Sequence, residues 1–418
     1  TALGTFLNVV IAIAIDQCVF KKASKAMQTV MIIPVFISYA AVQFIVYAYL
    51  STDTGILNNT FNIATRFYST PKAWPWILTI VKMWNSVGYG SVLYMSVLAG
   101  IDTSLYEAAE IDGANKWQQI RHITLPSLLP MITVMLLLSV GNIMRSDTGL
   151  FYQVTRNSGV LYSTTQVIDS YVLNSIFKNS NFGFTAATTF FQSIVGLFMM
   201  LLANGLVRKI APENALFYVR RHWKVMSKKN NHNYVPASKR AGVGQIILLC
   251  CLILYTLFCA LPIILVFIAA FTDEKMIAAN GFSYFPAKWS TAGMNAVLKY
   301  GKQLAVSYGV TIFITVGGTF IGLFVMSMFA YSISRKGFRL SKFLSVYMLI
   351  PMLFNGGQLS CYVIYTSYYH MKDSIWLLIF PLCVTTMNVI IIRTYIANSI
   401  PEELMEAAKI DGAGEYRT

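Results

Sequence analysis

One spacing of carboxylate, alanine and glycine residues occurs twice in the chain, and it is the strongest signal in the sequence. Residues 101–114 read IDTSLYEAAEIDGA, and residues 400–413 read IPEELMEAAKIDGA. The shared pattern is Glu-Ala-Ala-x-Ile-Asp-Gly-Ala, which begins at Glu107 and again at Glu406. A pattern that recurs at a fixed spacing points to a repeated structural unit.

The repeated pattern predicts a short helix, a glycine turn and a second helix. Leu105, Ala108 and Ala109 share one helical face, and small alanine side chains let another backbone approach closely. Gly113 supplies the permissive backbone expected after a helix end. Pro126 is expected to stop the second helix and open the next apolar stretch. This is the shape of an element that couples the chain to a soluble partner.

No other pattern in the sequence indicates a nucleotide-binding, metal-binding or catalytic site. The phosphate-binding pattern G-x-x-x-x-G-K-[ST] is absent, so the chain is not expected to cradle ATP. The four histidines are scattered, without an i, i+4 pair or a nearby carboxylate cluster, and the six cysteines lack metal-ligand spacing. We therefore expect no catalytic residue, no metal site and no cofactor in this chain.

The composition indicates a membrane protein. Of 418 residues, 56% are hydrophobic and 12% are charged, whereas soluble domains carry about 25% charged residues. The net charge of +15 is concentrated in short segments between apolar stretches. That distribution is typical of cytoplasmic loops, and it lacks the exposed aromatic residues of a nucleic-acid surface. We expect no nucleic acid among the partners.

Apolar stretches of membrane-spanning length predict an all-α, polytopic fold with about nine transmembrane helices. With the 21–27 loop placed in the cytoplasm, alternation puts both repeated patterns and every basic cluster on the cytoplasmic side. The predicted spans are approximately 2–20, 28–50, 76–99, 126–145, 184–206, 245–271, 306–333, 343–365 and 374–397.

The first repeat resembles the EAA loop of ABC importer permeases over its full length, from Glu107 through Gly113 to the Ile-x-Leu-Pro sequence that ends at Pro126. The second copy matches from Glu406 through Gly412, where the chain approaches its end. In that family the loop seats in a groove of the ATP-binding subunit. The resemblance implies docking residues Glu107, Ala108, Ala109, Asp112, Gly113, Leu125 and Pro126 in a first loop, 105–126, and Glu406, Ala407, Ala408, Asp411 and Gly412 in a second, 402–418.

The resemblance also implies a fold, a location and a set of partners. The fold would be the type-1 ABC importer transmembrane fold, in two partial copies. The chain would cross the bacterial inner membrane several times, with both EAA loops in the cytoplasm. Partners would be two ABC ATPase subunits, which bind ATP and Mg, an extracellular or lipoprotein solute-binding protein, complementary permease halves and membrane lipid. The substrate would be an oligosaccharide.

The two copies suggest parts of two permeases. Residues 1–217 resemble the later part of a carbohydrate-type permease, with about five spans. Residues 245–418 resemble the first part of its partner, with about four spans. The basic segment 218–244 is either a cytoplasmic linker or a translated intergenic sequence. Because the chain opens inside an apolar span and closes inside a motif, both ends are expected to be cut; the source DNA sequence decides between the two alternatives.

Polar and aromatic residues inside the spans are candidates for the substrate path, because sugar sites combine aromatic platforms with hydrogen-bonding groups. Hydrogen bonds between helices and anchoring at the membrane interface explain the same residues equally well. The candidates are Asn85, Tyr89, Tyr94, Asn142, Gln192 and Asn388.

Three other functions stay open on the sequence. An ABC importer permease could carry a solute other than a sugar. An ion-coupled secondary transporter would need ionisable residues inside the membrane, for which Asp16, Lys82 and Arg393 are the candidates. A membrane scaffold or receptor would not need either loop to bind an ATPase.

Overall fold

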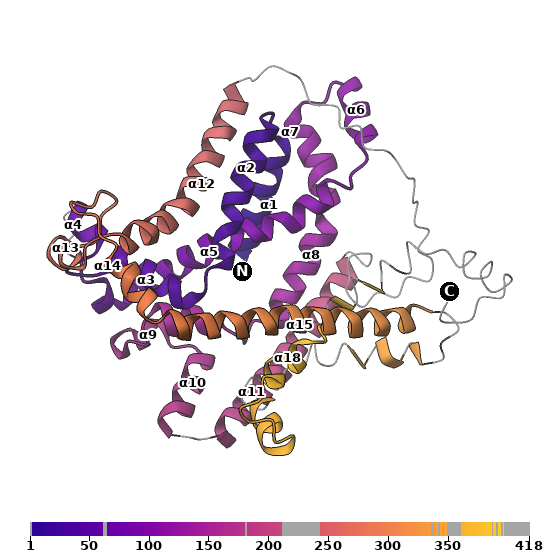
Figure 1. The fold of residues 1–418 in the computed structure, drawn as a ribbon. Coiled ribbons are helices and arrows are strands. Elements are labelled where there is room, and N and C mark those ends of the chain that lie inside the picture. Colours follow the sequence, from indigo (N-terminus) through magenta and orange to yellow (C-terminus); the bar gives the residue numbers. More distant parts are fainter. Residues whose placement is uncertain are drawn as a thin grey trace. The chain divides into compact units, whose positions relative to one another are not determined.

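The computed structural model describes residues 2–61, 65–179, 182–210, 243–335 and 361–386, together with single positions between 338 and 396. Helices dominate these residues, and the only pairing of extended chain among them is an isolated bridge between Thr272 and Trp289. The chain divides into two compact units, and Figure 1 shows the elements. The first unit comprises 1–179 and 198–296, and the second comprises 180–197 and 297–418.

The predicted all-α fold is confirmed. The helices of the first unit are α1 (Ala2–Gln17), α2 (Lys21–Ile32), η1 (Ile33–Phe36), α3 (Tyr39–Leu50), α4 (Ile56–Phe61), η2 (Phe67–Ser69), η3 (Pro71–Ala73), α5 (Trp74–Leu98), α6 (Thr103–Ile111), α7 (Lys116–Gln119), η4 (Ile120–Thr124), α8 (Leu125–Gly141), η5 (Gly149–Val154), η6 (Gly159–Leu161), α9 (Tyr162–Thr165), α10 (Ile168–Asn179), α12 (Val243–Ala270) and α13 (Glu274–Asn280). Helix α11 (Phe182–Ile210) and α14 (Ala292–Lys299) contribute residues to both units. The second unit adds α15 (Gly301–Ser334), η8 (Ile364–Tyr368), α18 (Trp376–Ile379) and η9 (Phe380–Leu382).

Four of the described helices are long and apolar enough to cross a membrane. They are Lys116–Gly141, Ala187–Lys209, Val243–Ala270 and Gly301–Ser334, and they match four of the predicted spans. Helix α1 is apolar but short, and α5 covers the predicted span 76–99 with polar residues inside it. More than half of the predicted span 343–365 lies outside the described residues. The predicted span 374–397 is described continuously only to 386, where it contains the short helices α18 and η9. The number nine therefore stays a prediction.

The predicted span 28–50 is wrong as a single straight helix. The segments Lys21–Phe36 and Tyr39–Leu50 meet at 103°. Pro34 lies at the start of η1, where its missing N–H leaves a backbone position unable to continue an α-helix. The hydroxyl of Ser38 then accepts a hydrogen bond from the amide of Ala41 at 3.4 Å, which starts α3 in a new direction.

The core of the first unit forms around α5. Helix α5 packs against α1, α2 and α8, and it buries Trp74 and Trp84 in a cluster with apolar side chains from α1, α2 and α3. The indole of Trp74 donates to the carbonyl of Phe67 at 2.9 Å, so the ring is buried with its polar atom satisfied. The loop segments and short helices at this end are thereby fixed to α5.

Helix α12 packs along the same group of helices, although more than 30 residues outside the description separate it from α11. At one end, the side chain of Gln245 donates to the carbonyl of Gln17 at 3.1 Å and accepts from the amide of Val19 at 3.2 Å. In the middle, the indole of Trp84 donates to the carbonyl of Cys259 at 3.2 Å. Polar groups along the whole helix therefore fix it to residues 1–98.

The second unit is held by apolar packing. Met326, Ala330 and Ile333 on α15 form a buried cluster with Met348 and Val389. Helix α15 also contacts α18 and η9.

Removing the buried hydrogen bond between α5 and α12 tests this packing. Trp84→Phe should lower the free energy of unfolding by about 1 kcal/mol, because it leaves a buried carbonyl without one of its donors. Denaturation of the purified chain in detergent micelles measures the effect. Trp76→Phe is the matched control, since Trp76 is 73% exposed. Equal effects of the two substitutions would show that α12 does not pack here.

Candidate functional site

The first repeated loop forms the predicted helix, turn and helix. Helix α6 begins at Asp102, whose carboxylate accepts from the amide of Ser104 at 3.0 Å. It ends at Asp112, and Gly113 follows with φ of 77°. Figure 1 shows α6 and α7 beside one end of α8.

Hydrogen bonds define the turn at the end of α6. The amide of Gly113 donates to the carbonyl of Glu110 at 3.1 Å, and the amide of Ala114 donates to the carbonyl of Ala109 at 2.8 Å. This pair of bonds is the Schellman motif, in which the residue after the helix adopts a left-handed conformation. An added Cβ at Gly113 would meet no atom within 4 Å. Glycine is therefore required by the backbone conformation and not by lack of space.

The second helix of the loop does not stop at Pro126, which corrects the sequence expectation. Helix α7 begins at Asn115, which forms a reciprocal capping box with Gln118. It continues through the π-helical turn η4 into α8, so Lys116–Gly141 is one helix of 26 residues. Pro126 lies in the first turn of α8 and has no N–H to donate. The wider π turn that precedes it accommodates this proline.

An ion pair closes the loop across the glycine turn. The ammonium of Lys116 lies 2.5 Å from the carboxylate of Glu110 and 3.0 Å from the side-chain oxygen of Gln119. The hydrogen bond and the charge of Lys116 lower the pKa of Glu110. Because a lowered carboxyl pKa favours the ionised form, the pair persists at neutral pH and is lost as pH falls through the lowered pKa.

Sequence reasoning missed this ion pair, although the repeat contained a signal for it. The positions of the second copy that correspond to Glu110 and Lys116 are Lys409 and Glu415. The two charges are therefore exchanged in the sequence of the second copy, so one acidic and one basic residue stand at these positions in both copies. The second copy, with Glu406, Ala407, Ala408, Asp411 and Gly412, lies outside the described residues.

One side of α6 is anchored to the membrane helices. The ring of Tyr106 packs in a cluster with Leu98 of α5 and Leu128 of α8. Its hydroxyl lies 2.9 Å from the hydroxyl of Thr124, which is buried. Helix α6 therefore packs against the ends of α5 and α8.

Three large apolar side chains of the loop are exposed. Leu105, Ile111 and Trp117 are 52%, 87% and 71% exposed. Of the other predicted docking residues, Glu107, Ala108, Asp112, Gly113, Leu125 and Pro126 are exposed, and Ala109 is half-buried. Large apolar side chains that are exposed within one short surface segment are candidates for a binding surface.

The candidate substrate residues of α5 have different environments. Asn85 is buried; its amide donates to the carbonyl of Pro34 at 2.8 Å, and its oxygen accepts from the hydroxyl of Tyr39 at 3.5 Å. Tyr94 is buried in the cluster beneath α6, whereas Tyr89 is exposed. Hydrogen bonding between elements accounts for Asn85, and core packing accounts for Tyr94.

The remaining candidates lie on other elements. The amide of Asn142 donates to the carbonyl of Leu138 at 3.0 Å at the end of α8, and its side chain is exposed. Gln192 is buried on the part of α11 that belongs to the second unit. Asn388 is exposed in the second unit. The six candidates are thus divided between the two units, and their place on a substrate path stays a prediction.

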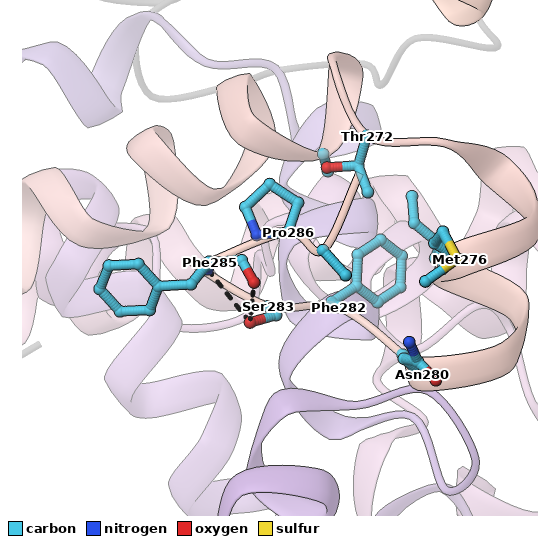
Figure 2. Close-up of a pocket in the computed structure, with 11 residues that line it drawn as sticks. Thr272, Met276, Asn280, Phe282, Ser283, Phe285 and Pro286 are labelled. Atoms are coloured by element: carbon cyan, nitrogen blue, oxygen red, sulfur yellow. Dashed lines mark hydrogen bonds between the residues drawn. The ribbon is translucent and has the colours of Figure 1, made fainter. Parts of the chain in front are cut away.

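Two cavities of the first unit do not suit an oligosaccharide. Figure 2 shows a pocket of about 170 Å³ between the end of α12, α13 and residues 281–287, where the hydroxyl of Ser283 accepts from the amide of Phe285 at 3.1 Å. It is smaller than ordinary ligand pockets. A larger cavity of about 460 Å³ lies between α3, α5 and α12, and its lining is almost wholly apolar. Sugar hydroxyls would lose their hydrogen bonds there.

Metal binding finds no support in the described part of the chain. Groups of three or more His, Cys, Asp or Glu side chains arranged to hold a metal ion are absent from it.

Comparisons with known proteins cover the part of the chain that contains the first loop. Residues 8–212 match the family described as binding-protein-dependent transport system inner membrane component. The polygalacturonan/rhamnogalacturonan transport system permease protein YteP of Bacillus subtilis is 27% identical over 209 residues, which cover 49% of this chain and 64% of that protein. The permease protein YtcP of the same transport system in Bacillus subtilis is 32% identical over 167 residues, 39% of this chain and 56% of its own.

A solved structure is also similar. It belongs to a bacterial alginate ABC transporter in complex with an alginate pentasaccharide-bound periplasmic protein, with 29% identity, a TM-score of 0.47, and coverage of 50% of this chain and 73% of that one. The chain thus spans less than two thirds of the length of the first curated relatives that it matches.

Replacing the turn glycine should loosen the loop. Gly113→Ala places a side chain on a left-handed backbone, which costs about 1–2 kcal/mol. We expect the amides of residues 112–114 to exchange hydrogen about tenfold faster, measured by mass spectrometry on the detergent-solubilised chain. Gly159→Ala is the control, because an added Cβ there also meets no atom and the backbone is not left-handed. Unchanged exchange in Gly113→Ala would contradict the turn geometry.

Exchanging the charges across the turn should preserve the loop. Glu110→Lys and Lys116→Glu should each weaken hydrogen-exchange protection in residues 110–116, whereas the double variant should recover most of it, since it recreates the charge order of the second copy. The coupling energy expected for an exposed pair is about 0.2–1 kcal/mol. A double variant that shows the sum of the two single effects would rule out the pairing.

Proposed function

We propose that this chain, whose residues 8–212 match the family of inner membrane components of binding-protein-dependent transport systems, forms part of the permease of an ABC importer for oligosaccharides. The permease would alternate between outward-facing and inward-facing states. ATP and Mg would bind to separate ATPase subunits, and this chain would contribute no catalytic group. The observation that carries the proposal is the exposure of Leu105, Ile111 and Trp117 on the α6–Gly113–α7 loop.

The geometry of this loop suits a helix that docks into a groove. Its anchored side, through Tyr106, is fixed to α5 and α8, and its free side presents Leu105, Ile111 and Trp117. A groove in a soluble partner can receive such a face as it receives an amphipathic helix. Glu107 adds an exposed carboxylate beside the face, where a basic group of the partner would pair with it.

Two ATPase subunits are proposed to engage two loops. The first is loop 105–126, and the second is the copy at 402–418. Both loops would lie on the cytoplasmic side of the bacterial inner membrane. ATP binding can shift the permease only if the ATPases prefer the loops in one conformation over the other, because equal affinity for both shifts nothing.

The names of the relatives support a saccharide as cargo. They include transport proteins for polygalacturonan and rhamnogalacturonan, and for lactose. A solute-binding protein outside the membrane would deliver the oligosaccharide, and complementary permease halves would complete the path within the lipid bilayer. The division of the chain into 1–217, 218–244 and 245–418 stays a prediction, and α12 packs with the first part whichever origin segment 218–244 has.

Co-purification with the ATPase tests the docking surface. Glu107→Arg reverses the charge beside the free face, and Gly113→Pro fixes φ near −65° where the loop has 77°. Each variant should reduce the ATPase recovered per permease by about tenfold or more. Glu274→Arg is the matched control, because Glu274 is an exposed carboxylate on α13. Undiminished association and ATP-coupled uptake in both loop variants would overturn the assignment.

A further inference from the structure

Lys82 places a positive charge on the central helix of the first unit. It lies eight residues after Trp74, the first residue of α5, which corresponds to about 12 Å along the helix axis. The exposed indole of Trp76 lies near that same end of α5, which is the predicted span 76–99. Aromatic residues of membrane proteins are enriched at the level of the headgroups. A lysine below this level is costly in lipid, so such residues almost always face a wet path or the protein interior.

An acidic partner accompanies Lys82. Its ammonium lies 2.8 Å from the carboxylate of Asp147 and 3.3 Å from the hydroxyl of Tyr39. Despite these contacts, the two charged side chains are 46% and 30% exposed. The ion pair is therefore reachable from outside the helices that carry it. Exposure to hydrocarbon would leave both charges poorly solvated, so the open side of the pair must face water or a polar ligand.

The backbone around the pair is interrupted in two elements. Tyr39 begins α3, immediately after the 103° bend between α2–η1 and α3. Asp147 lies in the irregular segment between α8 and η5. Non-helical backbone within a membrane is tolerated only where protein buries it or where it lines a water-filled cavity. Two breaks in the helices and an ion pair at one place indicate a polar site within the membrane. We call Lys82, Asp147 and Tyr39 together the polar station.

Close packing fixes the components of this station. A Cβ on Gly149 would lie 2.5 Å from the ring of Tyr39, so only glycine lets η5 approach α3 this closely. The hydroxyl and amide of Ser146 both donate to the carboxylate of Asp169, at 2.7 and 2.5 Å, which holds the segment that carries Asp147. The position of Asp147 is thus determined by its surroundings as well as by its attraction to Lys82.

We propose that Lys82 binds a carboxylate of the transported oligosaccharide, and that Asp147 is the internal counter-ion which this carboxylate replaces. The proposal rests on the proposed function and names its substrate class, an oligosaccharide that contains uronate residues. Two of the three N–H donors of Lys82 are directed at Asp147 and Tyr39, and the third can reach a ligand. Exchanging one carboxylate for another keeps the ammonium paired throughout, whereas a neutral sugar cannot replace Asp147.

Uptake of an acid and its neutral ester tests the proposal. Uptake is measured in cells that carry the complete transport system. Trigalacturonate and its methyl ester share one trisaccharide backbone, and the ester lacks the negative charges. Lys82→Met should reduce uptake of the acid by about tenfold and change uptake of the ester less than twofold, because it removes a charge-assisted hydrogen bond available only to the acid. Lys82→Arg, which keeps the charge, should retain the preference for the acid.

Further variants separate the possible outcomes. Asp147→Asn leaves Lys82 in place and should preserve uptake of the acid or raise it. Lys288→Met is the control, because it breaks an exposed ion pair with Asp273 elsewhere in the first unit. Equal losses for acid and ester in Lys82→Met, or no loss for either, would overturn the role of Lys82 while leaving the importer assignment intact. Wild-type cells that import neutral oligosaccharides with ATP but not trigalacturonate would overturn the uronate substrate class and leave the importer assignment intact, whereas cells with no ATP-dependent uptake of any oligosaccharide would overturn the proposed function itself.

Discussion

The uninterrupted helix from Lys116 to Gly141 is the feature on which the function of the surface loop depends. Since α7, η4 and α8 continue one another, the turn at Gly113 cannot move far without moving an apolar helix long enough to cross the membrane. Tyr106 adds a second connection, because it packs against the ends of α5 and α8. Packed interiors deform little. A push on α6 from a soluble partner would therefore be transmitted to both membrane helices together.

The same two helices, α5 and α8, also connect the loop to the ion pair of Lys82 and Asp147. Lys82 lies on α5, and Asp147 lies in the segment that follows α8. A displacement of α5 relative to α8 would thus change the geometry of an ion pair that tolerates little separation, since hydrogen-bonded charge pairs depend steeply on distance and angle. We infer that the docking surface and the polar station are coupled through α5 and α8, two elements that contact each other directly.

Local sequence rules predicted the helix and glycine turn of the loop, but they missed other parts of the loop and of the membrane helices. The repeat predicted the turn at Gly113 because a left-handed residue after a helix is a local requirement. It missed the passage through Pro126, because a π turn accommodates proline in a way that no short pattern encodes. The bend before α3 follows from Pro34 and the cap at Ser38, which apolar periodicity alone did not reveal. The burial of Asn85 arises from packing against a segment distant in the sequence. Polarity alone marked Asn85, Tyr94 and Lys82 alike, and only their surroundings distinguish a helix contact or a core residue from an exposed charge.

A cryo-electron microscopy structure of the chain assembled with its ATPase subunits tests the central claim most directly. We predict that Leu105, Ile111 and Trp117 become buried in a groove of one ATPase, with Glu107 beside a basic side chain and Gly113 still left-handed. An ATPase that contacts other cytoplasmic segments and leaves this face exposed would contradict the account.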